Sequence, residues 1–271
     1  MVHASPQTER EQRVMSVHRW NEDISSAETL VIIPTYNENE NIRALLRALT
    51  LLVIPIDILV ADDNSPDGTA ETVAAMAPNL PRRIYLMRRK GKFGLGVCYL
   101  DAFRYVEDAG LPYTCIVQMD ADFSHPPDAL SRMLPHVQTS GLVVGSRYTP
   151  GGSTPDWNQR RVTLSKAGNL YARTVLRLFA PAYPVRDNTA GFMAWRRDVL
   201  HRVISRPIFG DGYSFLTVLK FIAFRLGYPA QEVPICFRDR RLGVSKLNRH
   251  IILEAFLMPW RLGWKFRMPI N

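Results

Sequence analysis

The 271-residue chain has little of several features that define familiar protein classes. Its three cysteines, Cys98, Cys115 and Cys236, lie too far apart for a disulfide framework or a zinc motif, which indicates a reducing compartment. Its longest apolar runs, residues 51–60 and 251–264, are shorter than the ~18 residues of a membrane span. Because the N-terminus also lacks the apolar core of a signal peptide, we expect a protein on the cytoplasmic side without a transmembrane span.

Two common phosphate-binding signatures are missing as well. No Gly-x-Gly-x-x-Gly motif follows the first predicted strand, which argues against a dinucleotide-dependent dehydrogenase, and there is no Walker-type loop. The glycines of GKFGLG, residues 91–96, stand in the wrong order for either motif. The absence of a nucleic-acid-binding motif predicts no nucleic-acid partner. If the protein binds phosphate, it does so without a glycine-rich loop.

The charges are distributed unevenly along the chain. Residues 1–146 carry 13 Lys and Arg against 18 Asp and Glu, whereas residues 147–271 carry 21 against 7. The basic second half predicts an anionic partner. With nucleic acid disfavoured, a phosphorylated substrate and an anionic membrane surface both stay open.

The order of the predicted elements indicates an α/β fold. Apolar runs typical of buried strands alternate with helical patterns, which predicts a mostly parallel sheet flanked by helices. The predicted strands are 29–34, 56–61, 83–87, 113–119, 141–146, 191–195 and 230–237. The predicted helices are 37–49, 66–76, 94–110, 163–179, 196–204, 213–226 and a basic, aromatic helix from about 247.

Acidic or polar turns follow three of these strands. They are PTYNE at 34–38, ADDNSPDG at 61–68 and MDAD at 119–122. Ligands of open α/β sheets bind at the carboxyl ends of the strands. Carboxylates do not hold phosphate directly, but they hold a hard cation that does, and Mg²⁺ typically uses one or two of them. Asp120 and Asp122 are therefore predicted metal ligands, although aspartate and proline are also common in plain solvated turns.

Five motifs, taken in order, resemble those of the polyprenyl-phosphate (dolichol-phosphate) mannosyltransferases, which are inverting enzymes of glycosyltransferase family 2 with the GT-A fold. The motifs are VIIPTYNENENI, ADDNSPDGTAE, MDADFSHPP, GSRYTPGG and FRDRRLGVSKL. The resemblance implies transfer of mannose from GDP-mannose to polyprenyl or dolichyl phosphate. It also implies a GT-A catalytic domain over residues 28–247.

The resemblance assigns one set of residues to the donor. It implies nucleotide and diphosphate contacts at Pro34, Tyr36, Glu38, Asp62, Asp63, Met119, Asp120, Ala121 and Asp122. Asp120 and Asp122 would bind Mg²⁺ or Mn²⁺, and Ser124, which stands where the family often has glutamine, would be the third metal ligand. Asp67 has an equally good structural interpretation as the N-terminal cap of a helix.

A lipid phosphate acceptor requires nearby cations rather than a strong general base. A lipid monophosphate with a second pKa near ~6 is mostly dianionic at neutral pH, so it is already nucleophilic. The site must supply positive charge, and arginine binds phosphate with two parallel hydrogen bonds. The candidates are Arg147, Arg160, Arg161, Arg240 and Lys246, with Ser165 as a neutral donor. The predicted catalytic set is Asp122, Arg147, Arg240 and Lys246, of which the last two match the late basic loop that covers the nucleotide sugar in the family.

Basic helices indicate how the protein reaches a lipid. Lys166, Arg173 and Arg177 fall on one face of the predicted helix 163–179. A basic stripe is usually a solvated face, but with a lipid acceptor it also fits a helix lying on an anionic membrane surface. We expect a flexible tail at 1–27, an amphipathic membrane-contacting helix at 248–271 and a peripheral location on the cytoplasmic face of a membrane. The sequence leaves room for an integral-membrane partner protein.

Two alternatives stay open. The same fold could use UDP-glucose or another nucleotide sugar, because one sequence does not separate the residues that read the base and the sugar. A non-catalytic membrane-binding scaffold is the other alternative, against which the intact Asp120, Asp122 and late basic loop speak. A processive polysaccharide synthase is disfavoured because its Gln-x-x-Arg-Trp motif is absent.

Overall fold

A computed structural model describes residues 6–24, 27–210, 212–239 and 249–267 of the chain. It divides into two compact units, residues 1–123 and 124–271. The division falls inside the range 28–247, which the sequence predicts as one catalytic domain. Both units combine strands with helices, so the predicted α/β class is confirmed.

The first unit contains a mostly parallel sheet. Its strands are β1 (Val14–Trp20), β2 (Thr29–Thr35), β3 (Ile56–Asp62), β4 (Ile84–Arg89) and β5 (Cys115–Gln118), in the spatial order β1-β4-β3-β2-β5. All neighbours pair in parallel except β1, which is antiparallel to β4. The connecting helices are α2 (Asn39–Thr50), α3 (Thr69–Met76) with the 3₁₀ turn η1 (Ala77–Asn79), and α4 (Leu95–Asp108).

The core of this unit follows from its apolar patterns. Every residue of β3 is buried, as expected for a strand that is covered on both faces. Helix α2 buries an apolar stripe made of Ile42, Leu45, Leu46 and Leu49, whose spacing places them on one helix face. These two elements have the positions that the sequence predicted.

The N-terminal segment departs from the prediction. Residues Pro6–Arg13 form α1, and β1 runs antiparallel to β4 from Val14 opposite Arg89 to Trp20 opposite Ile84. The expectation of a flexible tail is therefore wrong for residues 6–20. The residues of β1 are half-buried or exposed, because it is an edge strand, and such a strand lacks the continuous apolar run by which the sequence revealed the others.

The second unit contains a smaller sheet. Its strands are β6 (Leu142–Ser146), β7 (Met193–Arg196) and β8 (Ala230–Pro234), with β6 antiparallel to β7 and parallel to β8. Its long helices are α7 (Gln159–Phe179), α8 (Arg197–Ile204), α9 (Tyr213–Arg225) and α10 (Arg249–Lys265). Short helical turns precede β6, namely η2 (Pro127–Ala129), α5 (Leu130–Met133), η3 (Leu134–His136) and α6 (Val137–Ser140).

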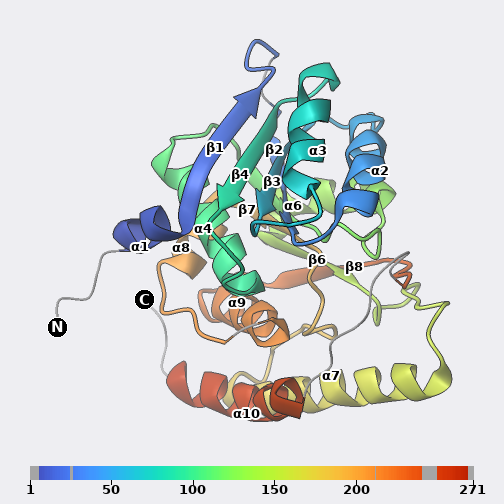
Figure 1. Cartoon of the computed structure of the whole chain (residues 1–271). Coiled ribbons are helices and arrows are strands. Elements are labelled where there is room, and N and C mark those ends of the chain that lie inside the picture. The colour runs from blue at the N-terminus through green and yellow to red at the C-terminus, as the bar shows by residue number, and fades with distance from the viewer. Residues whose placement is uncertain (1–5, 25–26, 211, 240–248, 268–271) are drawn as a thin grey trace. The chain divides into compact units, whose positions relative to one another are not determined.

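Helices α7 and α10 lie side by side in this unit (Figure 1). The ring of Tyr171 stacks on that of Phe256 with 4.7 Å between their centroids, and the Trp260 indole donates a 2.9 Å hydrogen bond to the Tyr171 hydroxyl. A side chain at Gly263 would collide with the Phe179 ring, so glycine permits this close approach. In the described part of the chain, no helix combines the length and the hydropathy needed to cross a bilayer.

Candidate active site

The predicted donor residues of the first unit lie at one edge of its sheet. Pro34 stands near the end of β2, Asp62 ends β3, and Asp120 and Asp122 follow β5. Strand β2 pairs in parallel with both β3 and β5, so the carboxyl ends of the three strands meet. This edge is where open α/β sheets bind ligands.

Asp62 supports the turn after β3. Its carboxylate accepts hydrogen bonds from the hydroxyl of Thr35 at 2.8 Å and from the backbone N–H and hydroxyl of Ser65 at 2.9 and 2.6 Å. These bonds connect the ends of β2 and β3. Asp62 therefore shapes the edge on which the predicted nucleotide contacts stand.

Asp63 is held by a buried arginine. Its carboxylate forms an ion pair with Nη1 of Arg89, whose Nη2 donates a 3.0 Å hydrogen bond to Asp101. Burial raises the pKa of Asp63, while the Arg89 guanidinium acts to lower it. Neither Arg89 nor Asp101 was predicted from the sequence. The signal that could have revealed Arg89 is an arginine at the end of an otherwise apolar strand, RIYLMRR.

Two more predicted nucleotide contacts stand between β2 and α2. Tyr36 is 38% exposed, and the Lys92 ammonium lies 4.0 Å from its ring centroid. Glu38 directly precedes α2 and accepts a 2.8 Å hydrogen bond from the amide of Asn41. An exposed aromatic ring beside a cation offers a nucleotide both a stacking surface and positive charge.

Asp67 links the starts of α2 and α3. It accepts hydrogen bonds from the backbone N–H groups of Asn39 and Thr69 and from the Thr69 hydroxyl. Burial acts to raise the pKa of Asp67, but these bonds outweigh it and lower that pKa. The N-cap position of α3 is Gly68 rather than Asp67, but Asp67 accepts hydrogen bonds from the first N–H group of each helix and so has a structural role at both helix starts.

The Asp120–Asp122 turn follows β5 and contains the two carboxylates that the sequence predicts as metal ligands. The Met119 N–H bonds to the carbonyl of Ile32, which fixes the start of the turn, and the buried Ala121 lies between the two carboxylates. Burial raises the pKa of the Tyr99 hydroxyl, and the negative charge of Asp120 raises it further. Within the described residues, no group of three or more His, Cys, Asp and Glu side chains could hold a metal. A carboxylate pair alone still fits Mg²⁺ or Mn²⁺, which also bind water and substrate oxygens.

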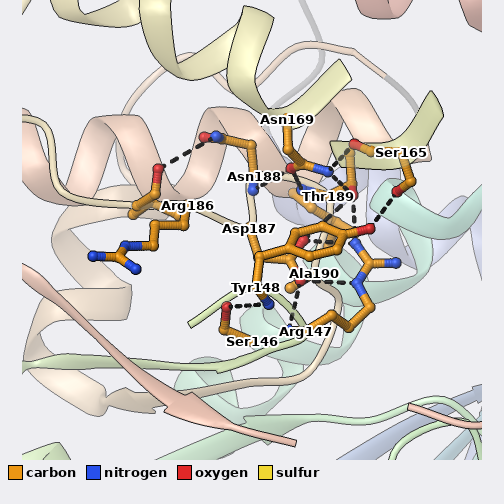
Figure 2. A network of polar contacts seen from close by, with 12 residues as sticks. Ser146, Arg147, Tyr148, Ser165, Asn169, Arg186, Asp187, Asn188, Thr189 and Ala190 are labelled. Atoms are coloured by element: carbon orange, nitrogen blue, oxygen red, sulfur yellow. Dashed lines mark hydrogen bonds and ion pairs between the residues drawn. The ribbon is translucent and has the colours of Figure 1, made fainter. Parts of the chain in front are cut away.

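In the second unit, Arg147 is fixed by the carboxylate of Asp187, a residue that was not predicted from the sequence (Figure 2). Its backbone N–H, Nε and Nη2 donate to the Asp187 carboxylate at 2.9, 2.8 and 2.6 Å, and Nη2 also donates to the Thr189 hydroxyl at 2.6 Å. Burial acts to raise the pKa of Asp187, but the charge and hydrogen bonds of Arg147 outweigh it and lower that pKa. The guanidinium therefore has a fixed orientation.

The same network reaches Ser165 on α7. The Tyr148 hydroxyl donates a 2.6 Å hydrogen bond to the Ser165 hydroxyl. The amide of Asn169 donates to the Ser165 carbonyl and to the Thr189 hydroxyl, and its oxygen accepts from the backbone N–H groups of Asn188 and Thr189. As Figure 2 shows, the end of β6, helix α7 and the loop 187–190 are thereby joined around Arg147 and Ser165.

A fully buried lysine holds the loop 187–190 from α9. Lys220 Nζ donates to the carbonyls of Asn188 at 3.0 Å, Ala190 at 2.6 Å and Leu216 at 3.4 Å. Burial lowers the pKa of Lys220 to about 7, against the raising effect of the Asp187 charge. Lys220 was not predicted from the sequence either, although a lysine inside the apolar stretch TVLKFIAF is a visible signal.

Arg161 lies in the first turn of α7. Asn158 caps this helix by accepting a hydrogen bond from the Arg161 N–H. Nη1 of Arg161 donates to both oxygens of Asp239 at 2.8 Å, and its guanidinium lies 4.0 Å from the Trp157 ring centroid. Its side chain is 42% exposed, so a ligand can still reach it. Arg240 and Lys246 lie outside the described residues.

A basic surface pocket adjoins this network. Its lining residues are Tyr148, Lys166, Asn169, Leu170, Arg173 and Arg186. Burial lowers the pKa of Arg173, and the positive charges of Arg177 and Arg186 lower it further. A bound anion would relieve this repulsion.

Comparison with known proteins identifies the family of this chain. The chain belongs to Glycosyl transferase family 2, whose profile matches residues 30–204. It is 41% identical to the polyprenol monophosphomannose synthase of Mycolicibacterium smegmatis, over 89% of this chain and 88% of that protein. It is 42% identical to the undecaprenyl-phosphate mannosyltransferase of Micrococcus luteus, over 86% and 93% of the two chains. The predicted family resemblance is confirmed.

More distant relatives extend the comparison. The dolichol-phosphate mannosyltransferase of Pyrococcus furiosus is 31% identical over 86% of this chain, which covers 62% of that protein. Among solved structures, the glucosyl-3-phosphoglycerate synthase of Mycobacterium tuberculosis with Mn²⁺, UDP and glucosyl-3-phosphoglycerate matches with a TM-score of 0.57 and 20% identity, over 90% and 80% of the two chains. This structural likeness confirms the predicted GT-A fold.

Proposed function

We propose that this glycosyltransferase moves mannose from GDP-mannose to a polyprenyl or dolichyl monophosphate, with inversion at the anomeric carbon. The observation that carries the acceptor assignment is an arginine fixed by Asp187 beside Ser165, next to a pocket lined by cations. Such an arrangement suits a phosphate monoester. The mannose assignment rests on the two relatives of about 40% identity, which are named for polyprenyl-phosphate mannose synthesis.

The first unit is assigned the donor. Pro34, Tyr36, Glu38 and the Asp62/Asp63 turn contact the nucleotide, and residues 119–122 lie against its diphosphate. Asp120 and Asp122 would hold Mg²⁺ or Mn²⁺, and Ser124 would be the third ligand. When bound, the metal neutralises charge on the departing diphosphate. The Mn²⁺ and UDP found with the M. tuberculosis enzyme support a divalent ion in this role.

The acceptor phosphate is assigned to Arg147, Arg161 and Ser165. One of its oxygens attacks the anomeric carbon of mannose, and the bond from that carbon to the donor diphosphate breaks, so that GDP leaves with the electron pair. No proton has to be removed from a dianionic phosphate. Because Asp187 already fixes Arg147, its donors need no reorganisation during the reaction. Arg240 and Lys246 are predicted to contact the donor diphosphate.

Helices α7 and α10 are assigned the membrane contact. Their exposed apolar side chains are Leu164, Leu170 and Leu178 on α7 and Phe256, Leu257, Trp260 and Trp264 on α10. Exposed cations, including Lys166, Arg261 and Lys265, stand among them. Apolar, tryptophan-bearing and cationic surface of this kind suits the interface of an anionic membrane. The proposal is a peripheral protein on the cytoplasmic face.

The proposal is tested by offering the purified protein GDP-mannose and UDP-glucose in parallel, with polyprenyl phosphate and Mg²⁺ or Mn²⁺. We expect mannose on the lipid from GDP-mannose and little transfer from UDP-glucose. Exclusive transfer of glucose would replace the donor. Absence of transfer from every nucleotide sugar would overturn the proposed reaction.

A further inference from the structure

Three arginines of the N-terminal segment contact one face of α4. The pairs are Arg10 with Asp108 at 2.8 Å, Arg13 with Asp101 at 2.7 Å and Arg19 with the Tyr105 hydroxyl at 3.0 Å. The α4 residues are spaced four and three apart, so their side chains form a single stripe. Side chains as well as β1–β4 pairing therefore attach this segment to the first unit.

Arg13 differs from the other two arginines in its partner. It binds Asp101 with two hydrogen bonds, from Nε at 3.0 Å and from Nη2 at 2.7 Å, and Asp101 is fully buried. The backbone of Arg13 is fixed as well, because its carbonyl accepts a 2.8 Å hydrogen bond from the N–H of Lys90. This places Arg13 beside the end of β4, where Arg89 lies.

The hydrogen bonds of Asp101 also reach the carboxyl edge of the sheet, where the donor is proposed to bind. Asp101 also accepts a hydrogen bond from Arg89 Nη2 at 3.0 Å, and Nη1 of Arg89 pairs with Asp63. Cations and carboxylates thus alternate in the series Arg13, Asp101, Arg89, Asp63. Arg89 and Asp101 have no exposed surface, so each depends on these neighbours for its charge balance.

Arg13 is important because it balances the number of positive and negative charges in this series. With Arg13 present, two cations serve two buried carboxylates. Without it, Arg89 alone would have to neutralise both Asp101 and Asp63. The carboxylate without exposed surface is Asp101, and an unpaired buried charge is costly, so Arg89 would be drawn toward Asp101 and away from Asp63.

We infer that Arg13 is a positioning residue of the donor site, which pairs with Asp101 so that Arg89 can hold the Asp63 carboxylate ionised and oriented toward the nucleotide. The inference rests on the proposed nucleotide contact of Asp63. It adds a residue from outside the family match, which begins at residue 30. The N-terminal segment thereby becomes part of the donor site.

The pH dependence of nucleotide binding follows from the charges around Asp63. The groups that act on it are Arg89 from β4, Asp62 on β3 and Cys98 on α4, and Asp101 on α4 is the second partner of Arg89. Burial already raises the pKa of Asp63. Loss of the Arg13 charge raises that pKa further, because Arg89, which pairs with both carboxylates, is then drawn toward Asp101 and away from Asp63. Binding that needs the carboxylate is lost as the pH falls through this pKa, so the loss must begin at a higher pH.

The experiment measures the dissociation constant of GDP with Mn²⁺ across the acid range for the wild type and for Arg13→Ala. We expect the acid limb of the profile to move up by about one pH unit, which is about tenfold weaker binding at a pH on that limb. Arg13→Lys should restore part of the shift. If Arg13→Ala does not fold, Arg13→Gln gives the same comparison.

Matched controls separate positioning from simple attachment of the segment. Arg10→Ala and Arg19→Ala remove the other two arginines, whose partners do not pair with Arg89 in the described structure, and both should keep the wild-type acid limb. In an Asp101→Asn background, Arg89 serves Asp63 alone, so adding Arg13→Ala should produce no shift. An unshifted limb in Arg13→Ala, or a full shift in the double variant, overturns the inference.

Failure of the proposed function gives a different result. If the wild type binds UDP but not GDP, the donor assignment falls, and the Arg13 comparison is made with UDP. If the wild type binds neither nucleotide, the donor site itself is wrong and the inference falls with it. Wild-type binding with an unchanged Arg13→Ala profile overturns only the role of Arg13.

Discussion

Substitution of single side chains can distinguish binding of the donor from binding of the acceptor in the proposed reaction. Arg147 is held by Asp187 and is assigned to the acceptor. Arg147→Ala should lower the rate with polyprenyl phosphate by on the order of 10²–10³, as for removal of one preorganised donor, while GDP-mannose affinity stays near the wild-type value. Kinetics with each substrate varied in turn decide this. A variant that lost only GDP-mannose affinity would place Arg147 on the other phosphate.

Asp122 provides the corresponding test for the metal. Asp122→Ala should abolish transfer and remove the metal dependence of GDP binding, because one of two carboxylate ligands is gone. The fold should survive, since the residue stands in a turn outside the strands and helices. Asp128→Ala, an exposed aspartate a few residues later, is the matched control. Unchanged metal dependence in Asp122→Ala would remove the metal site.

Lys220 makes stability depend on pH in a defined direction. Its pKa in the folded protein is lowered from 10.5 to about 7, so between these values the unfolded chain binds more protons, and stability rises with pH. Lys220→Met removes this dependence. The unfolding free energy of the wild type minus that of the variant should therefore grow above about pH 7, by at most ~1.4 kcal/mol per pH unit. Urea unfolding at neutral and alkaline pH measures it, and a constant difference would contradict the prediction.

Among the strands and helices, the ones that the sequence predicts closely are those whose buried residues form a recognisable local apolar pattern. Strands β2 and β3 are apolar on both faces, and α2 has a clear helical stripe, so both types were predicted closely. Strand β1 was missed because an edge strand carries no such run. Asp187 and Lys220 were missed for another reason. Their importance lies in contacts to residues about 30 or more positions away, and no local pattern encodes such contacts.

The helix pair α7–α10 is the predicted membrane-contacting surface. Trp264 is 66% exposed, whereas Trp260 also hydrogen-bonds to Tyr171, so Trp264 is the cleaner probe. Trp264→Ala should weaken binding to anionic vesicles severalfold, because an interfacial tryptophan is lost, and should leave GDP affinity unchanged. Val53→Ser, at a fully exposed apolar residue of the first unit, is the control. Wild-type vesicle binding by Trp264→Ala would place the membrane contact elsewhere.

Over the whole molecule, the distribution of charge matches the proposed assignment of the metal, the lipid phosphate and the membrane to different parts of the chain. The acidic first half contains the carboxylates assigned to the metal, and the basic second half contains the cations assigned to the lipid phosphate and the membrane. Exposed charges are screened by salt much more than buried pairs. Association with vesicles is therefore expected to weaken with ionic strength more than the buried Arg147–Asp187 pair does.

Strand β1 has a consequence for how copies of the protein behave toward one another. It occupies the outer side of β4, whose N–H and C=O groups would otherwise face solvent as an open template for pairing. A shortened protein that began at residue 28 would uncover a strand in which five of six residues are buried in the full chain. Such an edge invites self-association and aggregation. The N-terminal segment thus covers this edge, and a preparation that began at residue 28 would lose that protection.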